Sequence, residues 1–231
     1  DWGLHIGMVI NGLKKRNPDL PYFRDDFDPS VKYPPVVTSK DLEEIYPAEA
    51  AICKEDKDER AKARDVTAQL QDGHPAYGAL WQHLIDVSVT DLKRNFSNLG
   101  IDFDLWLGAS SVNNRIPQVV KRAKAEGIAV EKDGAIVIHV QEDTDKEDVP
   151  PLVLVKTNGG YTYQTTDIAT IDERVEKFHP DEIVYIVDQR QALHFKQVFR
   201  AAHRLKMAEG VLLEHDGFGT INGKDGKPFK T

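Results

Sequence analysis

The clearest chemistry in this sequence is suggested by Tyr163 and Asp167. They lie four positions apart in "GGYTYQTTDIA", where a helix is expected to begin. Side chains at this spacing share one face of a helix. A carboxylate can accept two N–H groups of a guanidinium, and an aromatic ring can support the cation. With Gln191 from the following loop, these residues predict a receptor for a cationic ligand.

The same segment has a second interpretation. Thr165 or Thr166 could cap the helix, and Asp167 would then only interact favourably with the N-terminal helix dipole. Acidic residues are common in the first turn of helices. The residue types alone therefore leave both interpretations open.

A second candidate region is the lysine- and glycine-rich segment "NGKDGKPFKT", which contains Lys224, Lys227 and Lys230. Lysines on a glycine-rich loop suit phosphate binding. A solvated surface turn explains the same composition equally well, and the spacing does not match a Walker loop. The segment is therefore a weak phosphate-binding candidate.

Metal and nucleophile chemistry receive no support from the residue pattern. The eight histidines are scattered, and Cys53 is the only cysteine. This pattern excludes a disulfide framework and a cysteine zinc cluster. There is also no nucleophile elbow that would indicate a Ser-His-Asp triad. We expect no structural metal.

The bulk composition indicates a cytoplasmic globular protein. The chain has 231 residues, 40% of them hydrophobic, and a net charge of −8. An acidic balance argues against a simple nucleic-acid coat protein. No apolar run has the length of a membrane span, and no signal peptide is present. A single cysteine suits a reducing compartment.

The first hundred residues are expected to be mainly helical. A helix is predicted over residues 2–16, and a helical hairpin over residues 40–97. Pro47 should interrupt the first arm of the hairpin, and Gly73 should end it. The segment "FDLWLG" then predicts a short strand at residues 103–108.

The remainder predicts alternating strands and helices. A helix ending at Gly127 is followed by a hairpin with Asp133 and Gly134 at its turn. The acidic run that comes next, residues 141–148, should be a solvated loop. Strand, helix, strand, helix and strand follow, and this order predicts a parallel sheet. The segment "EIVYIV" has the apolar character of a strand buried on both faces. Ligands of such sheets bind at the carboxyl ends of the strands, which here begin loops at Gly159, Val187 and Asp216.

Four segments in order carry a family resemblance: the opening "DWG", then "GGYTYQTTDIA", "VYIVDQRQALHF" and "GFGTINGKDGKPFKT". Together they resemble arginyl-tRNA synthetases, and the likeness covers most of the chain. The resemblance implies an α/β fold, the Rossmann-type parallel sheet of a class I synthetase catalytic domain with a mainly helical insertion. It places residues 1–16 in the first half of that domain, 17–150 in the connective insertion and 151–231 in the second half.

The resemblance also implies a reaction and its partners. The enzyme would activate arginine with ATP, accompanied by Mg²⁺, and transfer it to tRNA(Arg), acting as a monomer without membrane contact. Asp167 would hold the guanidinium, and the arginine site would also include Tyr163, Gln191 and His194. ATP would contact Phe218, Gly219 and Thr220, while Lys227 and Lys230 would lie in the second signature loop.

Two short segments bear on whether this chain is a complete enzyme. His5-Ile6-Gly7-Met8 differs by one letter from the His-Ile-Gly-His signature of class I adenylating enzymes. The resemblance makes this a chance likeness and places the true signature upstream. We therefore expect a piece of a longer protein, inactive by itself. Relatives often read Gly-Glu-Ser where this chain has Gly108-Ala109-Ser110, so this loop is not assigned a role in substrate contact.

An alternative interpretation is a synthetase-like paralogue that binds an amino acid or a nucleotide without charging tRNA. Such a module would not need the His-x-Gly-His signature, so the absence of the signature would be expected. The gene sequence upstream of Asp1 discriminates between the two: a His-x-Gly-His about thirty residues earlier supports the enzyme, in keeping with the position of "DWG" in the family.

Overall fold

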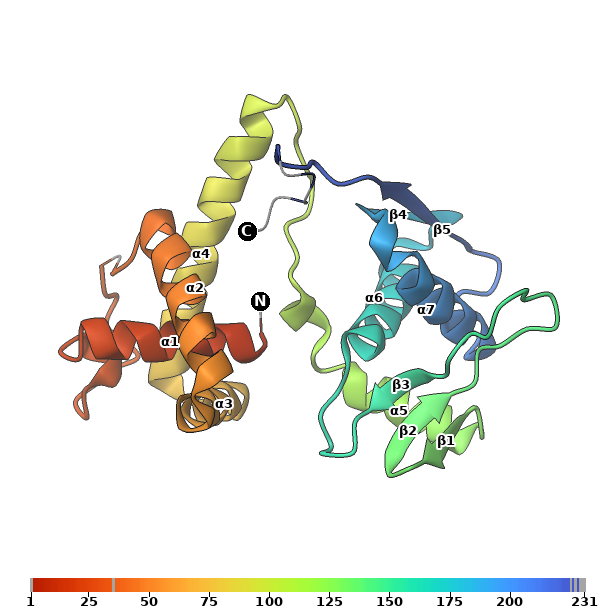
Figure 1. Cartoon of the computed structure of the whole chain (residues 1–231), viewed down its shortest axis with the longest axis horizontal. Coiled ribbons are helices and arrows are strands. Elements are labelled where there is room, and N and C mark those ends of the chain that lie inside the picture. The colour runs from red at the N-terminus through yellow and green to blue at the C-terminus, as the bar shows by residue number, and fades with distance from the viewer. Residues whose placement is uncertain (1, 35, 225, 227, 229–231) are drawn as a thin grey trace. The chain divides into compact units, whose positions relative to one another are not determined.

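The computed structural model describes residues 2–34, 36–224, 226 and 228. The chain divides between Ser110 and Ser111 into two compact units, and Figure 1 labels their helices and strands. Each unit has its own buried apolar cluster.

The first unit is helical. Its elements are α1 (Leu4–Arg16), a 3₁₀ turn at Pro21–Phe23, α2 (Ser39–Glu55), α3 (Lys57–Gln71) and α4 (Pro75–Asn98). Its fully buried side chains come from all four α-helices and include Ile10, Leu13, Ile45, Leu70 and Leu80. The only cysteine, Cys53, is buried on α2, and burial raises the pKa of its thiol.

Gly7 allows α1 to approach α3 closely. A Cβ atom at Gly7 would lie 2.1 Å from the carbonyl oxygen of Ala63 and 2.2 Å from the hydroxyl oxygen of Thr67. Real Cβ atoms do not tolerate such distances, so this contact requires glycine. The glycine of the His-Ile-Gly-Met segment is therefore explained by helix packing.

The predicted break at Pro47 is wrong. Pro47 lies inside α2, and the chain turns at Asp56 instead, where the Asp56 carboxylate caps α3 by accepting from the N–H groups of Asp58 and Glu59. Pro47 removes the N–H that would bond the carbonyl of Glu43. Both residues are exposed, so water can hydrate that carbonyl and the helix continues. The predicted end at Gly73 is confirmed, since α3 stops at Gln71 and Gly73 has φ of +88°.

The predicted strand at "FDLWLG" is also wrong. The segment belongs to no strand and has no pairing partner within the described part of the chain. Its alternating apolar side chains are 48–61% exposed: Phe103, Leu105 and Leu107. Alternation favours a strand, but a strand exists only where a neighbour satisfies its backbone groups.

The described residues of the second unit form five strands. Its elements are a 3₁₀ turn at Ala109–Val112 that begins at the unit boundary, α5 (Ile116–Ala125), β1 (Ala129–Lys132), β2 (Ala135–Ile138), β3 (Leu152–Val155), α6 (Tyr163–Phe178), β4 (Glu182–Asp188), a 3₁₀ turn at Gln189–Gln191, α7 (Ala192–Arg204) and β5 (Leu212–Phe218). The predicted hairpin is confirmed as β1 and β2, with positive φ at Asp133 and Gly134. The helix that ends before Gly127 is confirmed as α5.

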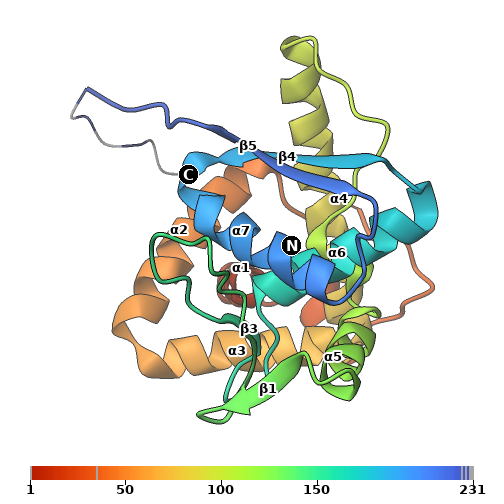
Figure 2. The same cartoon turned by 90° about the vertical axis from the view of Figure 1, so that its right-hand side faces the viewer.

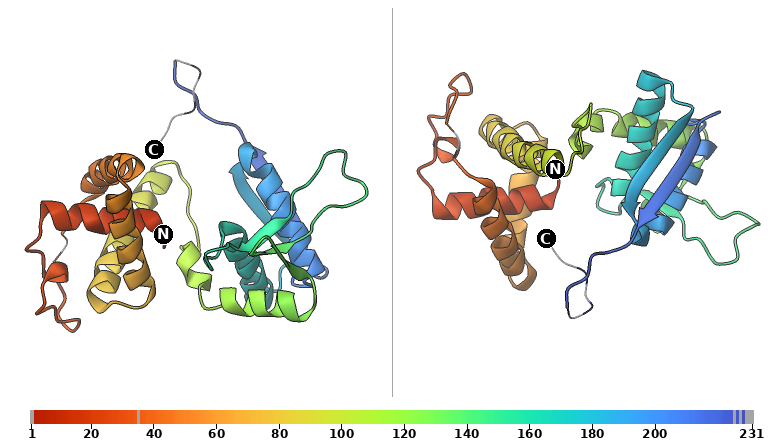
Figure 3. Two further views of the ribbon diagram at one scale, coloured as in Figure 1. Left: turned by 60° about the horizontal axis from the view of Figure 1, so that its bottom comes forward. Right: turned by 90° about the horizontal axis from the view of Figure 1, so that it is seen from above.

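Two separate sheets occupy this unit. β4 and β5 pair in parallel and in register, with Asp188 opposite Phe218, and α7 connects them. β3 does not join this parallel sheet, contrary to the sequence prediction. It pairs antiparallel with β2, the strand before it in the chain, as the edge strand of a separate three-stranded sheet. α6 and α7 lie side by side against the β4–β5 pair (Figures 2 and 3).

β4 is buried on one face only, so the prediction of burial on both faces is wrong. Ile183 and Tyr185 join the core formed with α6 and α7. Val184 and Ile186 point the other way and are 46% and 70% exposed. The reason is the side-chain alternation of a strand whose second face is not covered by any element of this unit.

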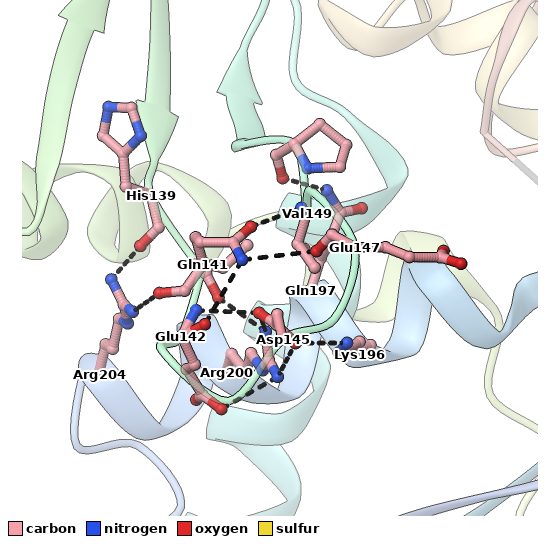
Figure 4. Close-up of polar contacts among 12 residues, drawn as sticks. His139, Gln141, Glu142, Asp145, Glu147, Val149, Lys196, Gln197, Arg200 and Arg204 are labelled. Atoms are coloured by element: carbon pink, nitrogen blue, oxygen red, sulfur yellow. Dashed lines mark hydrogen bonds and ion pairs between the residues drawn. The ribbon is translucent and has the colours of Figure 1, made fainter.

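The acidic run 141–148 is a loop, as predicted, but it is fastened to α7. The side chain of Asp145 is 3% exposed and pairs with Arg200 at 2.6 and 2.8 Å and with Lys196 at 2.7 Å (Figure 4). Arg204 donates to the carbonyl oxygens of His139 and Gln141. The guanidinium of Arg200 holds the pKa of Asp145 well below its usual range. The loop is thus anchored along one side of α7.

Candidate functional site

The start of α6 is fixed by Thr162. Its hydroxyl accepts from the N–H of Thr165 at 3.3 Å and donates to the carbonyl of Val153 at 2.6 Å. Thr165, which is fully buried, donates to the carbonyl of Leu154 at 2.6 Å. Both hydroxyls therefore fasten the first turn of α6 to β3.

This capping argues against the helix-dipole interpretation of Asp167. Thr162 is the N-cap, so a cap at Thr165 or Thr166 is wrong. Tyr163 is the first helical residue, and Asp167 lies beyond the first turn, which contains no acidic residue. A favourable interaction with the helix dipole fades within the first turn. Asp167 therefore needs another explanation.

Asp167 is paired with His194 from the first turn of α7. Asp167 Oδ2 and His194 Nε2 lie 2.6 Å apart, and their side chains are 30% and 22% exposed. The imidazole also meets the ring of Phe195 edge-on, at 5.1 Å between centroids. The carboxylate is therefore held in one orientation and remains accessible from solvent.

Tyr163 and Gln191 are placed beside this pair by their elements. Tyr163 lies one helical turn before Asp167 and is 71% exposed. Gln191 is the last residue before α7 and is exposed. Neither side chain forms a hydrogen bond to another residue in the described ranges. Both are available to a ligand near Asp167, although the structure does not bring them into contact with each other.

A cluster of aromatic rings packs against His194 through Phe195. Tyr185 on β4 packs against Phe195 at 4.9 Å, and Phe195 stacks on His215 at 4.9 Å. The Tyr185 hydroxyl is buried without a hydrogen-bond partner among the described residues. Burial, with a smaller contribution from the charge of Asp167, raises the pKa of Tyr185 to about 12. Sequence reasoning missed Tyr185, because a tyrosine inside an apolar strand resembles an ordinary core residue.

The residues predicted to contact ATP follow the neighbouring strand. Phe218 ends β5 and is 53% exposed, and Gly219 and Thr220 continue from it. The parallel register places Phe218 opposite Asp188, so the segment leading to Gln191 and the segment after β5 leave the sheet at the same edge. Gly217 allows β5 to lie close to the segment after β4, because a Cβ atom at this position would lie 1.9 Å from Gln189 Oε1. The predicted signature-loop lysines, Lys227 and Lys230, lie outside the described residues.

The described residues contain neither a metal-binding cluster nor a membrane-spanning helix. No cluster of three or more His, Cys, Asp or Glu side chains is arranged to hold a metal ion. No helix among these residues is both long enough and apolar enough to cross a membrane.

The whole chain is similar to known tRNA synthetases. Residues 1–231 match the family described as tRNA synthetases class I (R), catalytic domain. The chain is 47% identical over 232 residues to the arginine–tRNA ligase of Alkaliphilus oremlandii and 45% identical to that of Francisella tularensis subsp. novicida. These alignments cover all of this chain but only 40% and 39% of those proteins. The chain thus spans about 40% of the length of these relatives.

The fold is similar to that of solved synthetases. Arginyl-tRNA synthetase from Plasmodium falciparum matches with a TM-score of 0.70 and 24% identity, over 95% of this chain and 34% of that one. A putative arginyl-tRNA synthetase from Campylobacter jejuni matches with a TM-score of 0.52 and 15% identity, over 99% and 45% of the two chains. The α/β, Rossmann-type prediction is confirmed. The chain belongs to the class I tRNA synthetase (R) catalytic-domain family.

Proposed function

We propose that this chain forms part of an enzyme that activates arginine with ATP and transfers it to tRNA(Arg), and that Asp167 recognises the guanidinium. One observation carries the proposal: a carboxylate that is 30% exposed, oriented by His194 at 2.6 Å, lies one turn from an exposed tyrosine. Membership in the family, with whole-chain identities of 45–47% to arginine–tRNA ligases, supports the choice of ligand.

The proposed reaction has two steps. The carboxylate of arginine attacks the α-phosphorus of ATP, forming the P–O bond of arginyl-adenylate and releasing pyrophosphate. A terminal ribose hydroxyl of the tRNA then attacks the arginyl carbonyl, and AMP leaves. Such transfers depend mainly on positioning and charge stabilisation. In this chain, Asp167 would hold the side chain of arginine, with Tyr163 and Gln191 alongside it.

The nucleotide would lie where β5 ends. The exposed ring of Phe218 offers a surface for the adenine, and the backbone at Gly219 allows close approach. Mg²⁺ commonly binds through substrate phosphates with one or two carboxylates. We propose that Mg²⁺ arrives with ATP, where it would neutralise phosphate charge.

Arginine selectivity tests the assignment of Asp167. In the full-length protein, Asp167→Ala should weaken arginine binding by about 3–5 kcal/mol, because a desolvated guanidinium would lose its counter-charge. Canavanine, which keeps a guanidinium-like group, should compete with arginine, and citrulline, which is neutral, should not. The measurements are calorimetric titration and arginine-dependent ATP–pyrophosphate exchange.

Asp181→Ala provides a matched control, since Asp181 is an exposed acid between α6 and β4. It should leave arginine binding unchanged. Equal affinity for arginine and citrulline would reject the charge pair. Exchange driven by another amino acid would reject the proposed function as a whole.

A further inference from the structure

A pocket of about 410 Å³ opens on the first unit between α1, α3 and α4. This volume lies within the range of small-ligand sites. The lining includes ammonium, amide, carboxylate and phenol groups: Asn11, Lys14, Lys62, Asp65, Gln69 and Tyr77. None of these residues takes part in the proposed arginine site, so the proposed function does not account for this pocket.

The lysines at the pocket differ in their partners. Lys15 pairs with Glu49 at 2.7 Å and with Glu59 at 2.6 Å, and Lys62 pairs with Glu59 at 2.7 Å. Lys14 forms no ion pair within the part of the chain that the structure describes. The Lys14 ammonium is therefore the pocket's uncompensated positive charge. Lysine is a common point-charge ligand for phosphate.

Two nearly buried polar groups at the pocket also lack partners. Asn11 is 9% exposed, and no described residue hydrogen-bonds its side-chain amide. Tyr77 is 7% exposed, and its hydroxyl likewise bonds to no described residue. Burial raises the pKa of Tyr77, so at neutral pH the phenol is a hydrogen-bond donor. Both residues line the pocket, so the amide and the phenol are available to a polar ligand there.

An acceptor completes the lining. The Asp65 carboxylate accepts from Gln69 Nε2 at 2.6 Å, which leaves acceptor capacity for a ligand hydroxyl. An ammonium with two donors suits a phosphate, and a neighbouring carboxylate suits the hydroxyls of a sugar. We propose that this pocket binds a ribose phosphate group, either of a free nucleotide or of a single unit in an RNA strand.

The side-chain amide of Asn11 provides a local reporter for the test. The 231-residue chain, labelled with ¹⁵N, would be titrated with ribose 5-phosphate, with inorganic phosphate and with a hexamer of uridylate. Ribose 5-phosphate should shift the Asn11 amide signals and bind at least several-fold tighter than inorganic phosphate. Lys14→Ala should weaken this binding about tenfold, whereas Lys54→Ala, an exposed lysine on α2, should not change it.

The two ligand sources give different outcomes. Tighter binding of the hexamer, with a steep fall in affinity as salt rises, identifies an RNA strand as the ligand. Binding of ribose 5-phosphate that the hexamer does not exceed identifies a free nucleotide. The proposal is overturned if neither probe shifts Asn11, if Lys14→Ala binds as tightly as the wild type, or if inorganic phosphate binds as well as ribose 5-phosphate.

Discussion

At the scale of single residues, the pair formed by Asp167 and His194 leaves half of the carboxylate available. Asp167 Oδ2 faces His194, and Oδ1 forms no hydrogen bond to any described residue. The imidazole would therefore orient the carboxylate while the second oxygen accepts the ligand. In the proposed arrangement His194 would be a positioning residue, because it would act on arginine through Asp167.

His194→Ala should raise the KM for arginine about tenfold in the full-length protein, with a smaller effect on kcat. A hydrogen bond to a charged group contributes about 1.5 kcal/mol or more, which sets this scale. His194→Gln should restore much of the loss, because its amide can still donate to Asp167. Steady-state kinetics of ATP–pyrophosphate exchange would measure both.

The control for this substitution is His203→Ala, an exposed histidine on the same helix. It should leave the KM unchanged. If His194→Ala and His203→Ala behave alike, His194 does not position Asp167. A fall in kcat without a change in KM would also contradict this role.

At the scale of elements, the contact between α1 and α3 depends on Gly7. Gly7→Ala places a methyl group against the backbone of Ala63, so one helix must shift. Overpacking of this kind costs about 1–3 kcal/mol of unfolding free energy. Urea denaturation, followed by tryptophan fluorescence, would measure the loss.

Gly78→Ala is the matched comparison. Gly78 lies inside α4, and a Cβ there would meet nothing within 4 Å. The substitution should stabilise the unit by roughly 0.5–1 kcal/mol, because alanine favours helix more than glycine does. Equal effects of the two substitutions would contradict the packing explanation of Gly7.

An ion-pair cluster joins α1, α2 and α3 and should respond to acid. Hydrogen bonds from Lys15 and Lys62 lower the pKa of Glu59 from 4.5 to about 2. A carboxylate with a depressed pKa stabilises the folded state fully above the unfolded pKa and loses that contribution as pH falls through the folded pKa. The stabilisation from Glu59 should therefore be complete above about pH 4.5 and disappear toward pH 2.

Comparison of the wild type with Glu59→Gln isolates this contribution, because the other carboxylates titrate in both proteins. The difference in unfolding free energy should be constant between pH 5 and pH 7 and shrink between pH 4.5 and pH 2. Urea denaturation at each pH would supply the values. A difference that stays constant to pH 2 would show that Glu59 is not held by the lysines.

The elements also show what sequence patterns can and cannot predict. α6 and α7 follow from helical periodicity, and the β1–β2 turn follows from Asp133-Gly134, because both signals are local. The pairing of β3 with β2 and the attachment of Asp145 to α7 depend on residues 14 to 55 positions apart, which no local pattern specifies. In the site, the position of Asp167 was predictable, but its bond to His194 required the packing of α6 on α7.

At the scale of the whole molecule, the chain has two separate cores. One contains buried residues between Ile6 and Leu84, and the other contains buried residues between Val112 and Val211. All three tryptophans, Trp2, Trp81 and Trp106, precede the boundary at Ser110. Tryptophan fluorescence therefore reports on the first unit, whereas far-UV circular dichroism reports on both.

Unfolding should accordingly deviate from a single two-state transition. Fluorescence and circular dichroism should give different midpoints, since coincident transitions are the test of two-state behaviour. Gly7→Ala should shift the fluorescence midpoint. Asp145→Asn, which weakens the attachment of residues 141–148 to α7, should shift only the circular dichroism curve. Coincident curves for both variants would show that the units unfold together.

The buried thiol of Cys53 has a consequence for labelling kinetics. It is 3% exposed on α2, its pKa is raised by burial, and the chain contains no other cysteine. A thiol reagent needs an exposed thiolate, so it can modify only molecules in which α2 has opened. The rate of modification thus reports on the opening of α2 under native conditions.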